Sequence, residues 1–435
     1  MLSIKNYIEK YIKGNEIFTR FVNVFSVDVV VRGANFLLIP VFLYLMTQKE
    51  FGIYGYLYSF AMTVSGILNF GFYISMTKLY ADNVGEKKKQ ASMLFTVTTS
   101  FLVLVGLAML IIFFTKVDVD FFSLLNKSSG INSSTYLTYR VYVFVAILSM
   151  IFTNYITFYF VGSDQIRKLQ AFNIIRFLLA NVTAVLVLYF SAADSVMLRL
   201  AITYVAELFL TIIFGSFLFK NFLPKYNVDY LKKAFKIGMP IMIAALMGAM
   251  MNFGDKFFVM KYAGANDFAV YNLGILLATI VLIVYQSFNF IWFPLFLREK
   301  DLVVLRRKTR RYILIIFIGL SAIGLCLWLG TFIALEWKII PQKYNGVLPI
   351  LPILILSQVF ASLVSLLVNF MTYFEKTYIQ VFVGGGLSVI GYFLFDYFTK
   401  YYLGIGAAIV LLILNIISFI FYYTRTEYYI NNRLK

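Results

Sequence analysis

Residues 91–114 read ASMLFTVTTSFLVLVGLAMLIIFF, and this stretch decides the fold. It contains no charged residue, and as a helix of 24 residues it would extend about 36 Å, enough to cross a hydrocarbon core about 30 Å thick. A strand of a membrane β-barrel would alternate polar and apolar residues, whereas this run is continuously apolar. The stretch therefore predicts a membrane-spanning helix.

Runs of the same kind occur on both sides of this stretch along the whole chain. Together they predict twelve spanning helices, at 22–46, 52–76, 91–114, 137–161, 169–190, 196–219, 237–262, 268–294, 312–333, 346–372, 378–398 and 403–424. The composition agrees, because 61% of the 435 residues are hydrophobic and only 13% are charged, about half the charged share of a soluble domain. These values exclude a soluble globule and a disordered chain, and they predict an all-α polytopic membrane protein.

Basic residues are distributed unevenly among the predicted loops. The chain has 38 Lys and Arg residues against 20 Asp and Glu residues. If the N-terminus lies inside, the inner segments carry 26 of the basic residues and the outer segments carry 6. This bias follows the positive-inside rule and predicts that both termini are cytoplasmic. The basic cluster at 298–311 fits the same rule, so no nucleic-acid partner is expected.

Several kinds of chemistry are disfavoured by the residues that the chain lacks. It has no His, which is the commonest general base and zinc ligand, and its one Cys, Cys326, excludes a disulfide framework. No Gly-rich phosphate-binding loop of the ATPase type is present. We therefore expect no catalytic residue, no metal and no cofactor, and the protein is not expected to be an enzyme.

A weak internal repeat divides the chain near its middle. When the sequence is shifted by 217 residues, Phe51-Gly52-Ile53-Tyr54-Gly55 aligns with Phe268-Ala269-Val270-Tyr271-Asn272, and both pentads open a predicted helix. The repeat predicts an N-terminal half at 1–219 and a C-terminal half at 220–435, joined by the inner linker 220–236. Because each half has six helices, both halves begin on the inner side of the membrane and run parallel. In known transporters, two such halves surround a central cavity.

Charged and amide side chains interrupt the apolar helices. Arg32 lies near the middle of its helix, one turn from Asp28, and Arg176 has no acid on its own helix. Such side chains are costly in lipid and therefore indicate a water-filled cavity. The candidate substrate-binding residues are Arg32, Arg176, Lys256, Arg199, Asn35, Asn69 and Asn173, and the candidates for coupling or ion pairing are Asp28, Asp255 and Glu207. The alternatives are structural ion pairs, hydrogen bonds between helices, and snorkelling of Arg199 to the surface.

Two runs of sequence resemble a known family. They are Gly254-Asp255-Lys256-Phe257-Phe258-Val259, followed by Gly264, Phe268–Asn272 and Trp292-Phe293-Pro294, and Arg32-Gly33-Ala34-Asn35, followed by Pro40 and Phe51–Gly55. These motifs resemble those of bacterial polysaccharide transporters, the lipid-linked O-antigen or capsule repeat-unit flippases of the multidrug/oligosaccharidyl-lipid/polysaccharide exporter superfamily. The family commonly has Asp-Arg where this chain has Asp255-Lys256, a change that keeps the charge but loses the planar guanidinium fork.

The resemblance implies that the chain moves undecaprenyl-pyrophosphate-linked oligosaccharide units from the inner to the outer leaflet of a bacterial inner membrane by alternating access. O-antigen, lipopolysaccharide or capsule synthesis would be the setting, with a polysaccharide polymerase and a chain-length regulator as partners besides membrane lipid. By resemblance, Arg32 and Lys256 are the leading cavity residues. The alternatives are a multidrug/cation antiporter of the same superfamily, a peptidoglycan-precursor flippase, and a membrane polysaccharide polymerase.

Overall fold

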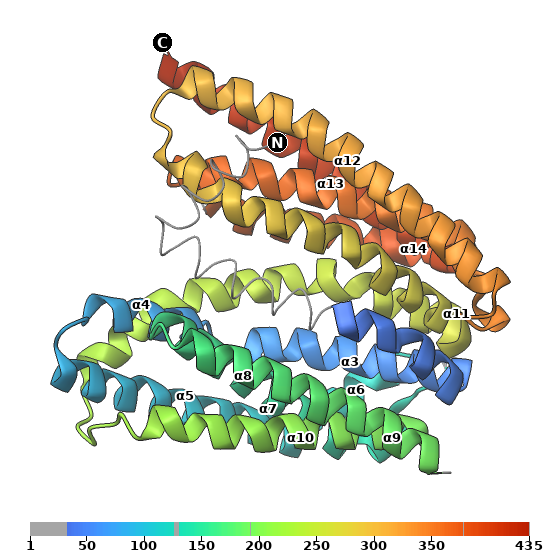
Figure 1. The fold of residues 1–435 in the computed structure, drawn as a ribbon, viewed down its shortest axis with the longest axis horizontal. Helices are drawn as coiled ribbons and strands as arrows, with labels where there is room; N and C mark the ends of the chain where they lie inside the picture. The colour runs from blue at the N-terminus through green and yellow to red at the C-terminus, as the bar shows by residue number, and fades with distance from the viewer. Residues whose placement is uncertain (1–32, 126–129, 192, 377, 435) are drawn as a thin grey trace, which may run out of the picture. The chain divides into compact units, whose positions relative to one another are not determined.

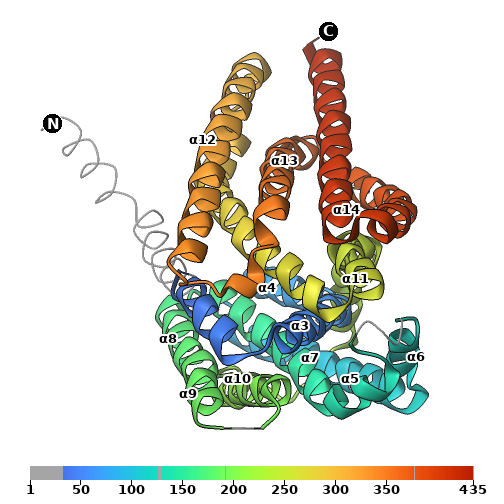
Figure 2. The same ribbon diagram turned by 90° about the vertical axis from the view of Figure 1, so that its right-hand side faces the viewer.

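The computed structural model describes residues 33–125, 130–191, 193–376 and 378–434. Within these ranges all regular secondary structure is helical (Figures 1 and 2). Nine helices in the described ranges are long and apolar enough to cross a membrane. The predicted all-α membrane architecture is confirmed at this level.

The helices follow one another with short connections. A helix at Gly33–Leu45 is followed by α3 (Gln48–Leu68), α4 (Phe72–Asp82), α5 (Lys87–Thr115), α6 (Val117–Ser123), α7 (Ser133–Gly162), α8 (Ile166–Phe177), the π-helix η2 (Leu178–Val182), α9 (Thr183–Phe190) and α10 (Ser195–Phe219). The second part of the chain forms α11 (Val228–Arg298), α12 (Leu302–Glu336), the 3₁₀ helix η3 (Gln342–Tyr344), α13 (Val347–Tyr373) and α14 (Tyr378–Leu434).

Two helices are far longer than a bilayer is thick. α11 has 71 residues and α14 has 57, and each contains one residue with non-helical backbone angles. In α11 this residue is Gly264, with φ 80° and ψ −179°, and in α14 it is Leu403, with φ 50° and ψ −133°. A positive φ breaks the right-handed helix. Each long helix therefore contains two of the predicted spans, with its break close to the predicted outer loop.

One predicted helix is interrupted. The prediction for 52–76 was a continuous span, but α3 ends at Leu68 and α4 begins at Phe72. Gly71 adopts φ 66° and packs so closely on the backbone of Gly238 that a β-carbon at either position would collide. Ser75 then donates a hydrogen bond of 2.8 Å to the carbonyl of Ala234. Close backbone contact, which the hydropathy of the sequence does not reveal, causes this break.

Acidic side chains start two of the helices. The carboxylate of Asp194 accepts hydrogen bonds of 2.9 Å and 3.0 Å from the amides of Val196 and Met197 at the start of α10. At the start of α12, the carboxylate of Asp301 accepts hydrogen bonds of 2.8 Å and 3.2 Å from the amides of Val303 and Val304. These amides have no partner within the helix, so the caps fix where each helix begins.

The chain forms two compact units. Unit 1 comprises Met1–Leu45, Val64–Thr115 and Tyr139–Met242, and unit 2 comprises Met46–Thr63, Lys116–Thr138 and Ile243–Lys435. Short segments of the predicted N-terminal half therefore pack with most of the C-terminal half in unit 2. The division into two repeated halves at 1–219 and 220–435 remains a prediction.

Aromatic side chains fill the cores of both units. In unit 1 the rings of Phe101 and Tyr155 stack 4.4 Å apart, and the Tyr155 hydroxyl is hydrogen-bonded to Thr98. In unit 2 the rings of Phe122 and Tyr136 stack 3.8 Å apart. Within unit 2, α13 lies between α12 and α14 (Figure 2). These packed rings hold the helices that carry the polar side chains described next.

Candidate functional site

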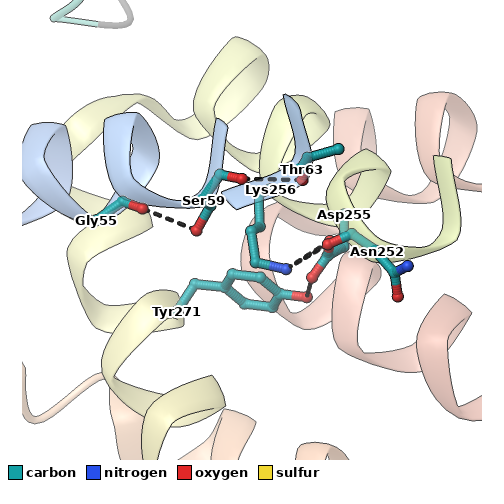
Figure 3. Close-up of polar contacts among 7 residues, drawn as sticks. All are labelled: Gly55, Ser59, Thr63, Asn252, Asp255, Lys256 and Tyr271. Carbon is teal, nitrogen blue, oxygen red and sulfur yellow. Dashed lines mark hydrogen bonds and ion pairs between the residues drawn. The ribbon is translucent and has the colours of Figure 1, made fainter. Parts of the chain in front are cut away.

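A buried polar cluster in unit 2 forms around Asp255 on α11. Asp255 is 1% exposed, and its carboxylate accepts a hydrogen bond of 2.9 Å from the hydroxyl of Tyr271, which is fully buried. The ammonium of Lys256 lies 3.3 Å from the other carboxylate oxygen. Figure 3 shows the Lys256 ammonium and the Tyr271 hydroxyl pointing to the same carboxylate. Asp255 is thereby held in one position by two donors.

Lys256 retains hydrogen-bonding capacity after these contacts. An ammonium has three N–H donors. One is directed at the carbonyl of Asn252, 2.8 Å away, and a second at Asp255. The contacts within the described ranges assign no acceptor to the third donor, and the side chain is 16% exposed. Lys256 can therefore bind an oxygen of a further group without losing its acid partner.

The second half of α3 provides hydroxyl groups in the same unit. Ser59 donates a hydrogen bond of 2.8 Å to the carbonyl of Gly55, and Thr63 donates one of 2.9 Å to the carbonyl of Ser59 (Figure 3). Both hydroxyl protons are used within the helix, so their oxygens remain available as acceptors only. Ser59 and Thr63 therefore make this part of α3 polar but uncharged.

A second intramembrane cluster lies in unit 1 and joins Arg176 to Glu207. The Nε atom of Arg176 lies 3.9 Å from a carboxylate oxygen of Glu207 on α10, and the other oxygen accepts a hydrogen bond of 3.1 Å from Ser149 on α7. The 3.9 Å contact is too long for a hydrogen bond. The Arg176 side chain is 31% exposed, whereas that of Glu207 is 15% exposed. Arg176 thus has an acid partner on a neighbouring helix while its N–H donors remain accessible.

The helix that carries Arg176 is irregular just beyond it. The π-helix Leu178–Val182 begins two residues after Arg176. A π-helical turn adds a residue to the turn and leaves carbonyl groups poorly paired within the helix. The hydroxyl of Thr203 on α10 lies 3.4 Å from the carbonyl of Ala180 in this turn. The bulge η2 therefore directly follows α8, which carries Arg176, and contacts α10, which carries Glu207.

The other predicted site residues have diverse surroundings. The guanidinium of Arg199 lies 3.6 Å from the centre of the Phe42 ring, a cation–π contact. Asn69 is buried at 3% exposure in the break between α3 and α4, whereas Asn35 is exposed and Asn173 is half-buried. Arg32 and Asp28 lie outside the described residues.

The structure therefore places the predicted residues in two groups. Lys256 and Asp255 belong to unit 2, whereas Arg176 and Glu207 belong to unit 1. Arg199, Asn35, Asn69 and Asn173 also belong to unit 1. The substrate role of all these residues remains a prediction.

Sequence analysis missed the neutral partners of both carboxylates. Tyr271 is 16 residues from Asp255, and Ser149 is 58 residues from Glu207. Tyr271 stands in the repeated pentad, and this was the only signal that could have singled it out. Arg140 was also missed; it is buried and donates a hydrogen bond of 2.8 Å to the carbonyl of Phe113 at the end of α5. Arg140 neutralises a helix terminus and has a structural role.

Acidic residues within the described ranges do not gather into a metal-binding group. No cluster of three or more His, Cys, Asp or Glu side chains was found there. The chemistry available at the two clusters is that of cations, carboxylates and hydroxyls. Such groups can bind phosphates and polyols by charge and hydrogen bonding.

Solved membrane transporters share this fold. A multidrug resistance MATE family transporter of the MOP superfamily, in an inward-facing conformation, matches with a TM-score of 0.70 at 14% identity, over 92% of this chain and 98% of that chain. The lipid II flippase MurJ, in an inward closed conformation, matches with a TM-score of 0.65 at 14% identity, over 93% of this chain and 87% of that chain. A MOP superfamily transporter from Pyrococcus furiosus, described as having a binding pocket of reversed polarity, matches with a TM-score of 0.58 at 13% identity, over 94% and 95%.

Sequence comparison identifies the family. A search of curated protein sequences finds no match. The sequence profile of the family described as "Polysaccharide biosynthesis protein" matches residues 21–299, well over half of the chain. The match includes both runs of sequence from which the resemblance was inferred. The chain is a multi-pass membrane protein with a MATE-like fold, and it belongs to the polysaccharide biosynthesis protein family.

Proposed function

We propose that the protein is a flippase for lipid-linked oligosaccharides, the building units of O-antigen, capsule or exopolysaccharide. It would have twelve spanning helices in two parallel six-helix halves around a central cavity, in a bacterial inner membrane with both termini cytoplasmic. Membership of the polysaccharide biosynthesis family supports the pathway. The fold shared with a protein described as a lipid II flippase supports the type of cargo.

One observation carries the proposal: two cations on membrane-spanning helices keep unused hydrogen-bond donors. Lys256 has a third N–H without an assigned acceptor in the described ranges, and Arg176 lies too far from Glu207 for a hydrogen bond. A pyrophosphate on the lipid carrier supplies oxygens that suit both groups. Hydroxyl and amide groups on the same helices suit the sugars. The lipid tail would remain in the bilayer.

The carboxylates beside the two cations affect how the substrate binds. Lys256 with Asp255, and Arg176 with Glu207, each form a pair without net charge. A phosphate must therefore bind the remaining donors, or displace a carboxylate that then takes up a proton or another cation. Carrying the substrate's negative charge outward is favoured by an inside-negative potential, by about 2.3 kcal/mol per charge per 100 mV. Energy from ATP is not required by this estimate.

The same carboxylates support a second candidate function, a multidrug/cation antiporter. Asp255 is almost fully buried and Glu207 is 15% exposed, so either could hold a cationic substrate or coupling ion. The multidrug transporter with the same fold belongs to this class. In an antiporter the carboxylates would be essential, whereas in the proposed flippase the cations would be.

The experiment measures translocation of a lipid-linked oligosaccharide in reconstituted vesicles. We expect Arg32→Ala, Arg176→Ala and Lys256→Ala to lower the rate, because each removes a phosphate-binding group. Lys400→Ala, which removes one charge from a predicted outer loop, serves as the control. Full activity in all three variants would refute the phosphate-binding role. Loss of activity in Asp255→Asn and Glu207→Gln alone, together with drug efflux, would identify an antiporter.

A further inference from the structure

One face of α12 is exposed over almost the whole helix. Its exposed apolar residues are Leu314, Ile315, Ile318, Leu325, Leu329, Phe332 and Ile333, each between 44% and 61% exposed. At 100° per residue these positions fall within one sector of the helix, and the buried residues, such as Leu305, Ile316 and Leu335, lie on the opposite side. Only 17% of the most apolar 18-residue stretch of α12 is buried, and this is the lowest share among the nine candidate spans in the described ranges. An exposed apolar face of this kind suits contact with lipid.

The length of the apolar face matches a bilayer. From Leu314 to Ile333 a helix rises about 29 Å, close to the ~30 Å of the hydrocarbon core. Arg311 and Arg307 continue the same sector by one and two further turns, and both are exposed. They therefore lie at the level of lipid headgroups, in the leaflet that the charge bias predicts to be cytoplasmic.

These two arginines differ from the other cations at this end of α12. Arg306 and Arg310 both pair with Glu427 near the end of α14. Lys308 pairs with Glu299 at 2.8 Å. Within the described ranges, neither Arg307 nor Arg311 has an acidic partner. Two like charges one turn apart on a helix repel each other, and a shared anion relieves that repulsion.

We propose that Arg307 and Arg311 form a binding site for an anionic phospholipid, with its acyl chains along the apolar face of α12 and its phosphate between the two guanidinium groups. The arginines give a planar fork suited to a phosphate, and the adjacent residues Leu314, Ile315 and Ile318 give a surface suited to acyl chains. A phospholipid is the occupant because the face is open to the bilayer along its whole length. A soluble phosphate would not use the apolar part.

The test measures lipid retention by the intact protein. Wild-type protein and variants are purified from micelles that contain equal amounts of phosphatidylglycerol and phosphatidylcholine, and the retained lipids are counted by native mass spectrometry. We expect the wild type to prefer phosphatidylglycerol. The double variant Arg307→Ala/Arg311→Ala is expected to reduce that preference by about fivefold for each arginine removed. Arg307→Lys/Arg311→Lys is expected to keep most of it.

The matched control is Lys338→Ala/Lys400→Ala, which removes the same net charge from predicted outer segments and is expected to leave the preference unchanged. An unchanged preference in the Arg307→Ala/Arg311→Ala variant, or an equal loss in the control, would overturn the proposal. A further arm adds farnesyl pyrophosphate. If the arginines retain this compound while the phosphatidylglycerol preference is unaffected by their removal, the site takes a lipid pyrophosphate, and the phospholipid proposal is wrong. Because both arginines are exposed, the variants are expected to fold.

Discussion

Gly55 packs directly against the side chain of Asn272, its partner in the internal repeat. A β-carbon at Gly55 would collide with the Asn272 amide, and one at Gly52 would collide with the carbonyl of Ala265 and approach the amide nitrogen of Ala269 to 3.3 Å. Gly52 and Ala269 are also repeat partners, separated by the same 217 residues. The two pentads therefore contact each other within unit 2.

This contact leads to a prediction about Gly55. The variant Gly55→Ala is expected to lower the free energy of unfolding by about 1–3 kcal/mol, because the methyl group displaces the buried Asn272 side chain from its position. Gly66→Ala on the same helix is the control, since nothing lies within 4 Å of its β-carbon position, and it is expected to be neutral or stabilising by up to about 1 kcal/mol. Thermal unfolding of the intact protein in detergent measures both. Equal behaviour of the two variants would contradict the close packing.

Much of the fold could be predicted because apolar length is a local property. The run at 91–114 corresponds to α5, and the run at 346–372 corresponds to α13 within one residue at each end. The break at Gly71 was missed because it depends on contact with Gly238, far away in the sequence. Hydropathy likewise gives no indication of the π-helix after Arg176.

The candidate sites were predicted only in part. A charged residue in an apolar helix is visible in sequence, so Lys256, Asp255, Arg176 and Glu207 could be named. Their neutral partners could not, because a tyrosine or serine in a membrane helix carries no strong signal. Pairing between helices depends on which faces meet, and this is decided by packing. The helix that carries Arg176 has no acidic residue, as the sequence shows, but Glu207 on α10 provides an acidic partner for Arg176.

The buried cluster around Asp255 can be tested by a double-mutant cycle. Lys256→Met is expected to destabilise the protein by about 3–5 kcal/mol, because it leaves a buried carboxylate without its cation. Asp255→Asn/Lys256→Met is expected to cost less than Lys256→Met alone, since no buried charge remains. Tyr271→Phe is expected to cost about 1–3 kcal/mol through the lost hydrogen bond to Asp255. Additive effects of the Asp255 and Lys256 substitutions in chemical unfolding would show that the two residues are not coupled.

Ionisation of Glu299 is predicted to make the stability of the protein depend on pH. Hydrogen bonds from Lys308 and from the backbone amide of Asp301 lower the pKa of Glu299 below its usual value near 4.5. A carboxyl group whose pKa is lowered by folding stabilises the folded state above that usual value, and this contribution disappears as the pH falls below it. The difference in melting temperature between the wild type and Glu299→Gln is therefore expected to shrink below pH 4.5. Glu336→Gln, at the other end of α12, is the control, and a difference that stays constant down to pH 3 would contradict the prediction.

The pair formed by Arg176 and Glu207 separates a structural role from a transport role. Within the described ranges, Arg176→Ala leaves Glu207 with the hydrogen bond from Ser149 alone, and because the arginine is 31% exposed, we expect a modest loss of about 1–2 kcal/mol in stability. Adding Glu207→Gln removes the uncompensated charge and is expected to restore most of that stability. If Arg176 binds the substrate's phosphate, transport in vesicles stays low in the double variant although stability recovers. If the arginine only neutralises Glu207, transport recovers together with stability, so the comparison of the two measurements distinguishes the roles.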